Sequence, residues 1–164
     1  MVAVKAGFNC IIVSGNLRVS GNISVQGCQS RSQGGAIWSN NFTMESGDLK
    51  IQHCSAYEGG AIYADHVQVH GGTMEITNCQ ATSGGGIYAK WSLLMGGRLR
   101  ANGCRARDGG ALYAHHHVRQ SGGELILQSC VARHNGGGLQ TQQYSLSDGA
   151  LVLLVLHFFC FFGP

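Results

Sequence analysis

One unit of about 25 residues recurs five times along the chain. Its first half reads Gly-x-Φ-x-Φ-x-x-Cys, where Φ is an apolar residue, and the copies begin at Gly21, Gly47, Gly72, Gly97 and Gly123. Its second half opens with a Gly-Gly pair and reads GGAIWS, GGAIYA, GGGIYA, GGALYA and GGGLQT in chain order. Self-similarity at a period of about 20 to 50 residues is the sequence signature of a solenoid. The repeat therefore predicts one elongated domain of stacked coils.

Apolar and polar residues alternate at period two before each cysteine, as in residues 73–77. Such alternation is typical of a half-buried strand. Two residues, rather than one, separate the last apolar position from the cysteine, so the chain must bend there. Asn78 occupies this bend in one coil, and Gly27 and Gly103 occupy it in two others. These residue types tolerate left-handed dihedral angles, which supports the bend.

A second short strand is expected to carry the cysteine, and a third begins after the Gly-Gly corner, as at residues 61–64, and continues to Val69. Glycine suits that corner because it permits unusual dihedral angles and places no side chain between coils. Stacked coils pair strand on strand about 4.8 Å apart. The sequence predicts an all-β chain, a right-handed parallel β-helix of about five 25-residue coils. One interior column comprises Ile37, Ile62, Ile87, Leu112 and Leu139.

The repeat divides the chain into three parts. Residues 1–19 are expected to form a partial N-terminal coil or cap, residues 20–146 the β-helix, and residues 147–164 an atypical apolar segment. This last part begins a sixth coil, but Leu156 replaces the expected cysteine and the polar alternation is lost. Its apolar run is shorter than the roughly 20 residues that span a bilayer. A cap, a truncated membrane anchor and a gene-model artefact are the alternatives, and membrane association is expected only through this segment.

The cysteines of the five copies align in one column and lie 25 or 26 residues apart: Cys28, Cys54, Cys79, Cys104 and Cys130. One cysteine per coil gives a line of thiols rather than the tetrahedral cluster that zinc requires, so no metal is expected. In-register stacking leaves neighbouring Cβ atoms about 4.8 Å apart, slightly beyond the usual disulfide range. We interpret the column as a buried structural spine of free thiols, with disulfides between coils as the alternative.

An aromatic column lies next to the interior column and is expected to point outward. Its members are Trp38, Tyr63, Tyr88 and Tyr113. Aromatic rings in a row could stack on sugar rings as a carbohydrate-binding face, or could stack on one another and cover the sheet. We favour the structural interpretation and retain the column as the candidate binding site.

Charged residues and histidines give no further site. The 11 basic and 8 acidic residues are scattered, without the basic face that nucleic acid would need, so no nucleic-acid partner is expected. The acidic residues fall in different columns, which predicts neither a carboxylate pair nor a calcium cage, and no catalytic residue or cofactor is assigned. A constant spacing of 25 residues aligns His66, Trp91 and His116, an arrangement that we interpret as a polar corner.

The Gly-Gly segments resemble the repeats of the polymorphic outer-membrane protein family, whose surface-exposed regions carry GGA(I/L/V) and FxxN motifs. The first motif is matched at residues 34–37, 59–62 and 109–112 and approximately at 84–87 and 136–139, whereas cysteine replaces the asparagine of the second. The resemblance covers residues 20–145. It implies a cell-surface or adhesin-like protein in the pectin-lyase-like group of β-helices, located at the cell surface or outside the cell.

The sequence thus predicts a non-enzymatic surface or adhesin-like scaffold that mediates protein or glycan interaction. The variable corners at residues 31–33, 57–58 and 105–108 are expected to select its partner. A polysaccharide lyase or hydrolase on the same fold is the alternative. The N-terminus lacks the apolar run of a secretory signal. If the chain is exported by a eukaryote, the sequon at Asn41 is expected to accept a glycan better than that at Asn22.

Overall fold

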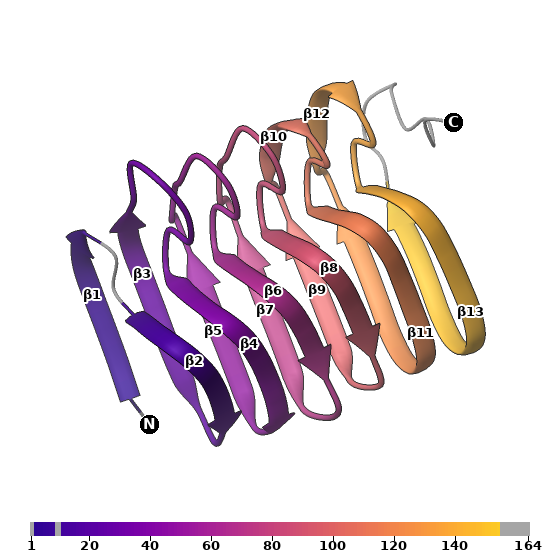
Figure 1. The fold of residues 1–164 in the computed structure, drawn as a ribbon, viewed down its shortest axis with the longest axis horizontal. Coiled ribbons are helices and arrows are strands. Elements are labelled where there is room, and N and C mark those ends of the chain that lie inside the picture. Colours follow the sequence, from indigo (N-terminus) through magenta and orange to yellow (C-terminus); the bar gives the residue numbers. More distant parts are fainter. Residues whose placement is uncertain (1, 9–10, 155–164) are drawn as a thin grey trace.

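The computed structural model describes residues 2–8 and 11–154, and every regular element in them is a β-strand (Figure 1). This part of the chain contains no helix long and apolar enough to cross a membrane. The prediction of an all-β chain is confirmed. The strands are β1 (Val2–Phe8), β2 (Ile11–Ser20), β3 (Ile23–Gln29), β4 (Ile37–Ser46), β5 (Asp48–Gln52), β6 (Ile62–Val69), β7 (Thr73–Thr77), β8 (Ile87–Met95), β9 (Arg98–Asn102), β10 (Arg105–Asp108), β11 (Leu112–Gln128), β12 (Val131–Asn135) and β13 (Leu139–Leu154).

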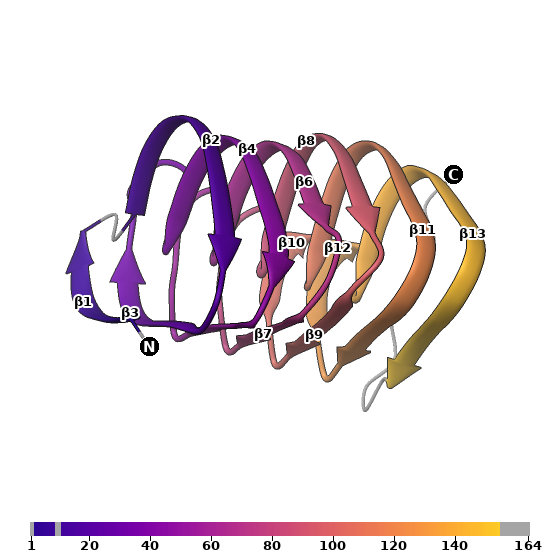
Figure 2. The ribbon, with the colours of Figure 1, turned by 90° about the horizontal axis from the view of Figure 1, so that it is seen from below.

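The strands wind as successive coils along one axis (Figures 1 and 2). One face consists of β1, β3, β5, β7, β9 and the second half of β11, and the opposite face consists of β2, β4, β6, β8 and the first half of β11. In Figure 1 the front strands run downward and the rear strands upward as the chain advances from left to right, so the coils are right-handed. All pairings between these strands are parallel, and the predicted parallel β-helix is confirmed.

A third, shorter side joins the two faces between each cysteine and the next Gly-Gly pair. Only β10 and β12 form regular strands there, whereas the earlier coils are joined by isolated bridges such as Ser55 to Gln80 and Glu58 to Ser83. In most coils the predicted second strand is therefore replaced by single bridges between neighbouring coils. The bend before it has the expected left-handed geometry, with φ of 52° at Asn78.

The Gly-Gly corner is as tight as the repeat predicts. Gly59 has a φ of +64°, and a Cβ atom added to Gly60 would lie 2.2 Å from the carbonyl oxygen of Gly85 in the next coil. A side chain at the second glycine would therefore separate the coils. The first glycine is needed for another reason, because its positive φ is unfavourable for residues with a side chain.

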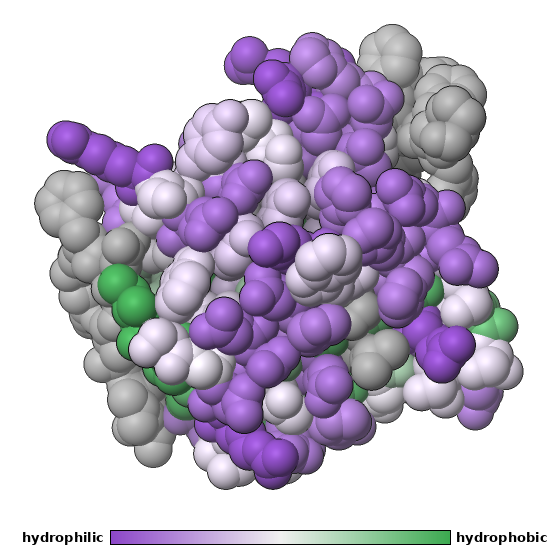
Figure 3. Space-filling model, in the orientation of Figure 1, coloured by the Kyte–Doolittle hydropathy of each residue, from purple (hydrophilic) through white to green (hydrophobic). Residues whose placement is uncertain are grey.

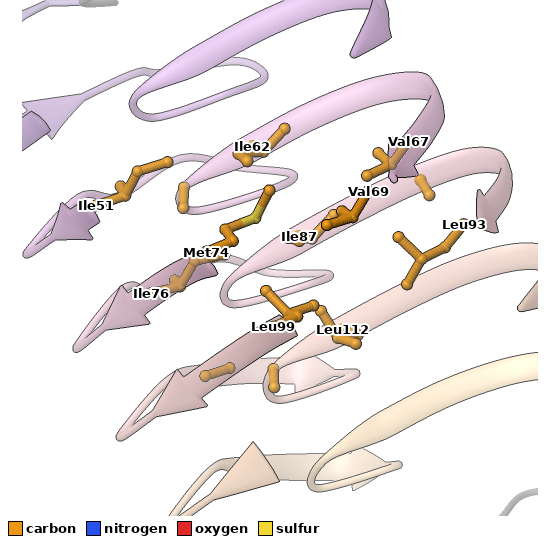
Figure 4. Packing of buried hydrophobic residues seen from close by; sticks show 14 of the residues in the cluster. Ile51, Ile62, Val67, Val69, Met74, Ile76, Ile87, Leu93, Leu99 and Leu112 are labelled. Carbon is orange, nitrogen blue, oxygen red and sulfur yellow. The ribbon is translucent and has the colours of Figure 1, made fainter. Parts of the chain in front are cut away.

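Apolar side chains from both faces meet inside the solenoid (Figure 4). Ile62 and Ile87 on the front strands are fully buried, as are Met74 and Ile76 on the rear strands. The predicted interior column is thus confirmed. Outside, charges of opposite sign align across coils: Lys50 Nζ lies 3.5 Å from Glu75 Oε2. The surface seen in Figure 3 is hydrophilic over most of its area.

The same architecture extends toward both ends of the described chain. β1 pairs with β3, and β2 pairs with β4, so residues 2–8 and 11–20 add strands to the two faces. At the other end, residues 147–154 continue β13 alongside β11, where Leu125 pairs with Leu151. Residues 155–164, which include Leu156, lie outside the described residues.

Candidate functional site

The three tyrosines of the aromatic column stack on one another. The ring centroids of Tyr63 and Tyr88 are 5.2 Å apart with 10° between the planes, and those of Tyr88 and Tyr113 are 5.0 Å apart with 7°. Tyr63 is 7% exposed, and the other two are half-buried. Because both faces of the Tyr88 ring contact tyrosines, neither face is available to a sugar ring.

Trp38 continues this column and is tied to the corner of its own coil. Its indole Nε1 donates to Gln33 Oε1 at 3.1 Å, and Gln33 Nε2 donates to Glu58 Oε2 at 3.0 Å. Burial, followed by the nearby Glu58 carboxylate, raises the pKa of Tyr63 and of Tyr88 to about 12. The tyrosines therefore remain neutral at physiological pH, and their stacked rings cover the outer side of the sheet.

The side chains of the cysteine column lie inside the coils and are buried. Cys54, Cys79, Cys104 and Cys130 are buried free thiols, whereas Cys28 is disulfide-bonded, so the thiol interpretation does not extend to the first coil. The Cys130 thiol donates to the carbonyl oxygen of Gln128 at 3.2 Å. A hydrogen bond with the Cys54 thiol, followed by burial, raises the pKa of Cys79. The same hydrogen bond lowers the pKa of Cys54, and a hydrogen bond with Cys104 lowers the pKa of Cys130. All four thiols are nevertheless buried away from reagents, so the column has a packing role.

A groove of about 620 Å³ runs along the short corner side of the solenoid. Residues from four successive coils line it. The groove is hollow because Ala56, Ala81 and Ala106 have small side chains. Its lining is completed by longer side chains at the rims. The lining residues are Ser55, Ala56, Gln80, Ala81, Thr82, Arg105, Ala106, Arg107, Val131, Arg133 and His134.

The groove is positively charged. Arg105 and Arg107 come from β10 and Arg133 from β12, all three are exposed, and no acidic residue lines the groove. Arg107 Nε donates to Asp108 Oδ2 at 3.0 Å, just outside the lining. The expectation that basic residues are scattered is therefore wrong at this place. The reason is that stacking brings together residues about one coil apart in sequence, which a scan for local runs of Lys and Arg does not detect.

The predicted variable corners contribute unequally to this groove. Residues 105–107 line it, whereas residues 31–33 do not. Tyr57 is 58% exposed in the corner of its own coil without being part of the lining. A search of the repeat for arginines at equivalent corner positions, rather than for local runs, would have identified Arg107 and Arg133 together.

A second aromatic stack, which the sequence analysis did not single out as a binding site, lies where the front face bends. The Trp91 and His116 rings are 4.9 Å apart with 7° between the planes. His66 does not align with them as predicted, because it pairs with Ser92 across a register shift. The constant spacing of 25 residues failed here because the coil of Trp91 contains an additional residue.

No metal site accompanies the groove and the ring stack in the described residues, and the glycosylation sequons lie apart from both. Among residues 2–8 and 11–154, no group of three or more His, Cys, Asp or Glu side chains could hold a metal ion. Asn22 is exposed between β2 and β3, whereas Asn41 lies within β4 and its Nδ2 donates to Asn16 Oδ1 at 2.7 Å. Asn22 is thus the more exposed of the two, although its Oδ1 accepts a hydrogen bond from Asp48 N at 3.0 Å, and the expected glycan at Asn41 stays a prediction.

Comparison of the chain with protein-family models, with curated proteins and with solved structures finds no match.

Proposed function

We propose that the protein is a non-enzymatic binding scaffold that holds an acidic segment of a partner protein in the corner groove. The observation that carries this proposal is the convergence of Arg105, Arg107 and Arg133 on a groove without acidic lining residues. Guanidinium groups bind carboxylates through paired, charge-assisted hydrogen bonds. The interior of the solenoid supports these side chains on short, paired strands, so little ordering of the scaffold is needed on binding.

The dimensions of the groove favour an extended peptide. It crosses four coils, which at about 4.8 Å per coil corresponds to roughly 14 Å along the axis. An extended chain advances about 3.3 Å per residue, so about four residues of a partner would lie in the groove. Arg105 and Arg107 lie on one coil and Arg133 on the next, so two or three acidic side chains of such a segment would face them.

A surface or adhesin-like role is part of the same proposal. The GGA(I/L) segments at residues 34–37, 59–62 and 109–112, which resemble those of polymorphic outer-membrane proteins, support an extracellular or cell-surface location in the pectin-lyase-like group. The alternative, a polysaccharide lyase or hydrolase, would need carboxylates that are free to act on substrate. Several are instead paired with cations, as in Lys90 with Asp65 at 3.9 Å and Arg98 with Glu124 at 2.8 Å.

The test compares two charge reversals of equal size. The variant R105E/R133E changes the groove, and R100E/R119E changes two exposed arginines outside it. Fluorescein-labelled hexaglutamate is titrated into each protein at two salt concentrations, with hexalysine as the control peptide. We expect the groove variant to lose at least about tenfold in affinity and the control variant less than about twofold. Salt should weaken the remaining binding.

Equal losses in the two variants, or equal binding of hexalysine, would refute the proposed groove. Polysaccharides are incubated with the same protein to test the alternative. Release of reducing ends or of unsaturated uronate from any of them would establish the enzyme instead.

A further inference from the structure

Two adjacent coils carry one additional residue where the front face bends. Ala64 pairs with Ala89 and His66 with Ser92, so Lys90 and Trp91 together lie opposite the single residue Asp65. A strand with such an extra residue forms a β-bulge, which re-aims its side chains and often marks a functional position.

The following coil repeats this extra residue and the coil after it does not. Ala114 pairs with Ala89, so His116 lies beside Trp91. Ala114 also pairs with Thr141 and His117 with Gln143, which leaves His115 and His116 opposite Gln142 alone. The two bulges therefore coincide, and the coil on either side has one residue fewer at this place.

The projection consists of two parallel rings. Trp91 and His116 stack at 4.9 Å, and Trp91 is 45% exposed, which places it among the exposed large hydrophobic residues of the described chain. Lys90 Nζ lies 5.7 Å from the centroid of the Trp91 ring. This stack differs from the tyrosine column, in which Tyr88 is enclosed by rings on both sides.

The stack borders a hollow of about 1050 Å³. Its lining contains one indole, three imidazoles and two carboxamides, without any carboxylate or guanidinium. Imidazole and carboxamide groups both donate and accept hydrogen bonds. The lining residues are His66, Trp91, His116, His117, Gln142 and Gln143.

We propose that this hollow binds a saccharide on the Trp91 and His116 bulge. A pyranose ring presents an apolar C–H face that packs on an exposed indole, here beside the Lys90 ammonium that pairs with Asp65. Its hydroxyl groups both donate and accept hydrogen bonds, as the side chains of Gln142 and Gln143 do. A concave, partly apolar surface with a few convergent polar groups is typical of ligand sites. The inference goes beyond the proposed function, because the corner groove shares none of these residues.

The chain contains two tryptophans, Trp38 and Trp91, which makes the test direct. In the W38F variant, all indole emission comes from Trp91. This variant is titrated with the neutral oligosaccharides cellohexaose, maltohexaose, mannohexaose, xylohexaose and chitohexaose, and the wild type is screened on an array of neutral and acidic glycans. We expect at least one saccharide to shift the Trp91 emission to shorter wavelength with saturation, because the sugar displaces water from the indole.

Calorimetry with the saccharide that binds then assigns the residues. We expect W91A to weaken binding at least about tenfold, W91F to retain part of it, and W38F to match the wild type. R105E/R133E should bind this saccharide normally, so failure of the corner groove and failure of the saccharide site are distinguishable. The unfolding midpoint of W91A reports on folding, and Q142A/Q143A provides a second variant that leaves the ring stack intact and should also lose affinity.

Silence of the whole array together with an unchanged Trp91 emission would overturn the inference. So would a saccharide that W91A and Q142A/Q143A both bind as well as the wild type does. Binding confined to acidic glycans, lost in R105E/R133E and kept in W91A, would assign saccharide binding to the corner groove and would also overturn it.

Discussion

The ring of Tyr88 stacks on the ring of Tyr113 with 5.0 Å between their centroids and 7° between their planes. The same strand pairing sets Ile87 beside Leu112 in the core, on the opposite side of the sheet. One register therefore aligns an aromatic column outside and an aliphatic column inside. Because a slip by one residue would exchange the two columns, the stacked tyrosines stabilise the register of the coils.

Removal of the central ring of this column should destabilise the protein. Tyr88→Ala deletes two ring contacts, each worth about 0.5 to 1.5 kcal/mol, so we expect a loss of roughly 1 to 3 kcal/mol in the free energy of unfolding. Urea unfolding measures it. Tyr57→Ala is the matched control because that side chain is 58% exposed, and it should cost less than about 0.5 kcal/mol. Equal costs would show that the stack contributes nothing.

The tyrosine column should also make stability depend on alkaline pH. Burial, then the Glu58 carboxylate, raises the pKa of Tyr88 from 10.0 to about 12. A raised pKa means that the folded state holds its proton while the unfolded state has lost it. The contribution is therefore complete below pH 10 and is lost as the pH rises toward 12.

Tyr88→Phe tests this dependence, since it keeps the ring and removes the ionisable hydroxyl. We expect the unfolding free energy of the variant to decline less steeply above pH 10 than that of the wild type. Parallel curves for the two proteins would contradict the assignment of the decline to this hydroxyl.

The second glycine of the corner should tolerate no side chain. A Cβ atom at Gly60 would lie 2.2 Å from the Gly85 carbonyl oxygen, and because this is backbone the coils themselves would have to separate. We expect Gly60→Ala to cost more than about 3 kcal/mol or to prevent folding. Gly122→Ala is the control, because the nearest atom to its Cβ would be 3.9 Å away and its cost should stay below about 1 kcal/mol. Thermal unfolding of both proteins decides the point.

The repeat correctly predicts features that are set within one coil, such as side-chain orientation and bends. It fails for contacts between coils where neighbouring coils differ in length. The inward positions of Met74 and Ile76 follow from period-two alternation, and the left-handed φ at Asn78 follows from the slip in that alternation. The Trp91 stack and the arginine groove follow only in part: the 25-residue spacing aligns Trp91 with His116 but wrongly adds His66, and Arg107 and Arg133 lie too far apart in sequence to form a local basic run. Both depend on which residues meet across coils, and a single additional residue, such as the one before Ser92, changes that alignment.

The buried thiols should resist alkylation in the native protein. Cys79 is fully buried, and both its hydrogen bond with the Cys54 thiol and its burial raise its pKa, so reagent access and thiolate formation fail together. We expect iodoacetamide to label Cys79 only after denaturation, as peptide mass spectrometry would show. Gln80→Cys places a thiol at the next, exposed position and should react readily. Similar labelling of the two thiols would mean that the column is open to solvent.

A polar pair replaces apolar packing near the last described coil. Gln120 is fully buried, its Oε1 accepts a hydrogen bond from Tyr144 Oη at 2.7 Å, and its Nε2 donates to the Ala150 carbonyl at 3.0 Å. Met95 occupies the equivalent position of the preceding coil. An apolar residue therefore fits this column. The glutamine differs from it by hydrogen-bonding two residues of β13.

Because each partner satisfies the other, single and double replacements should not add. Tyr144→Phe leaves the Gln120 oxygen without its donor and should cost about 1 to 3 kcal/mol, and Gln120→Met leaves the tyrosine hydroxyl unpaired at a similar cost. The double variant Q120M/Y144F removes both groups and extends the Met95 column, so its stability should return to within about 1 kcal/mol of the wild type. Urea unfolding of the four proteins gives the coupling free energy. A coupling near zero would mean that the two side chains reach other partners when one of them is removed.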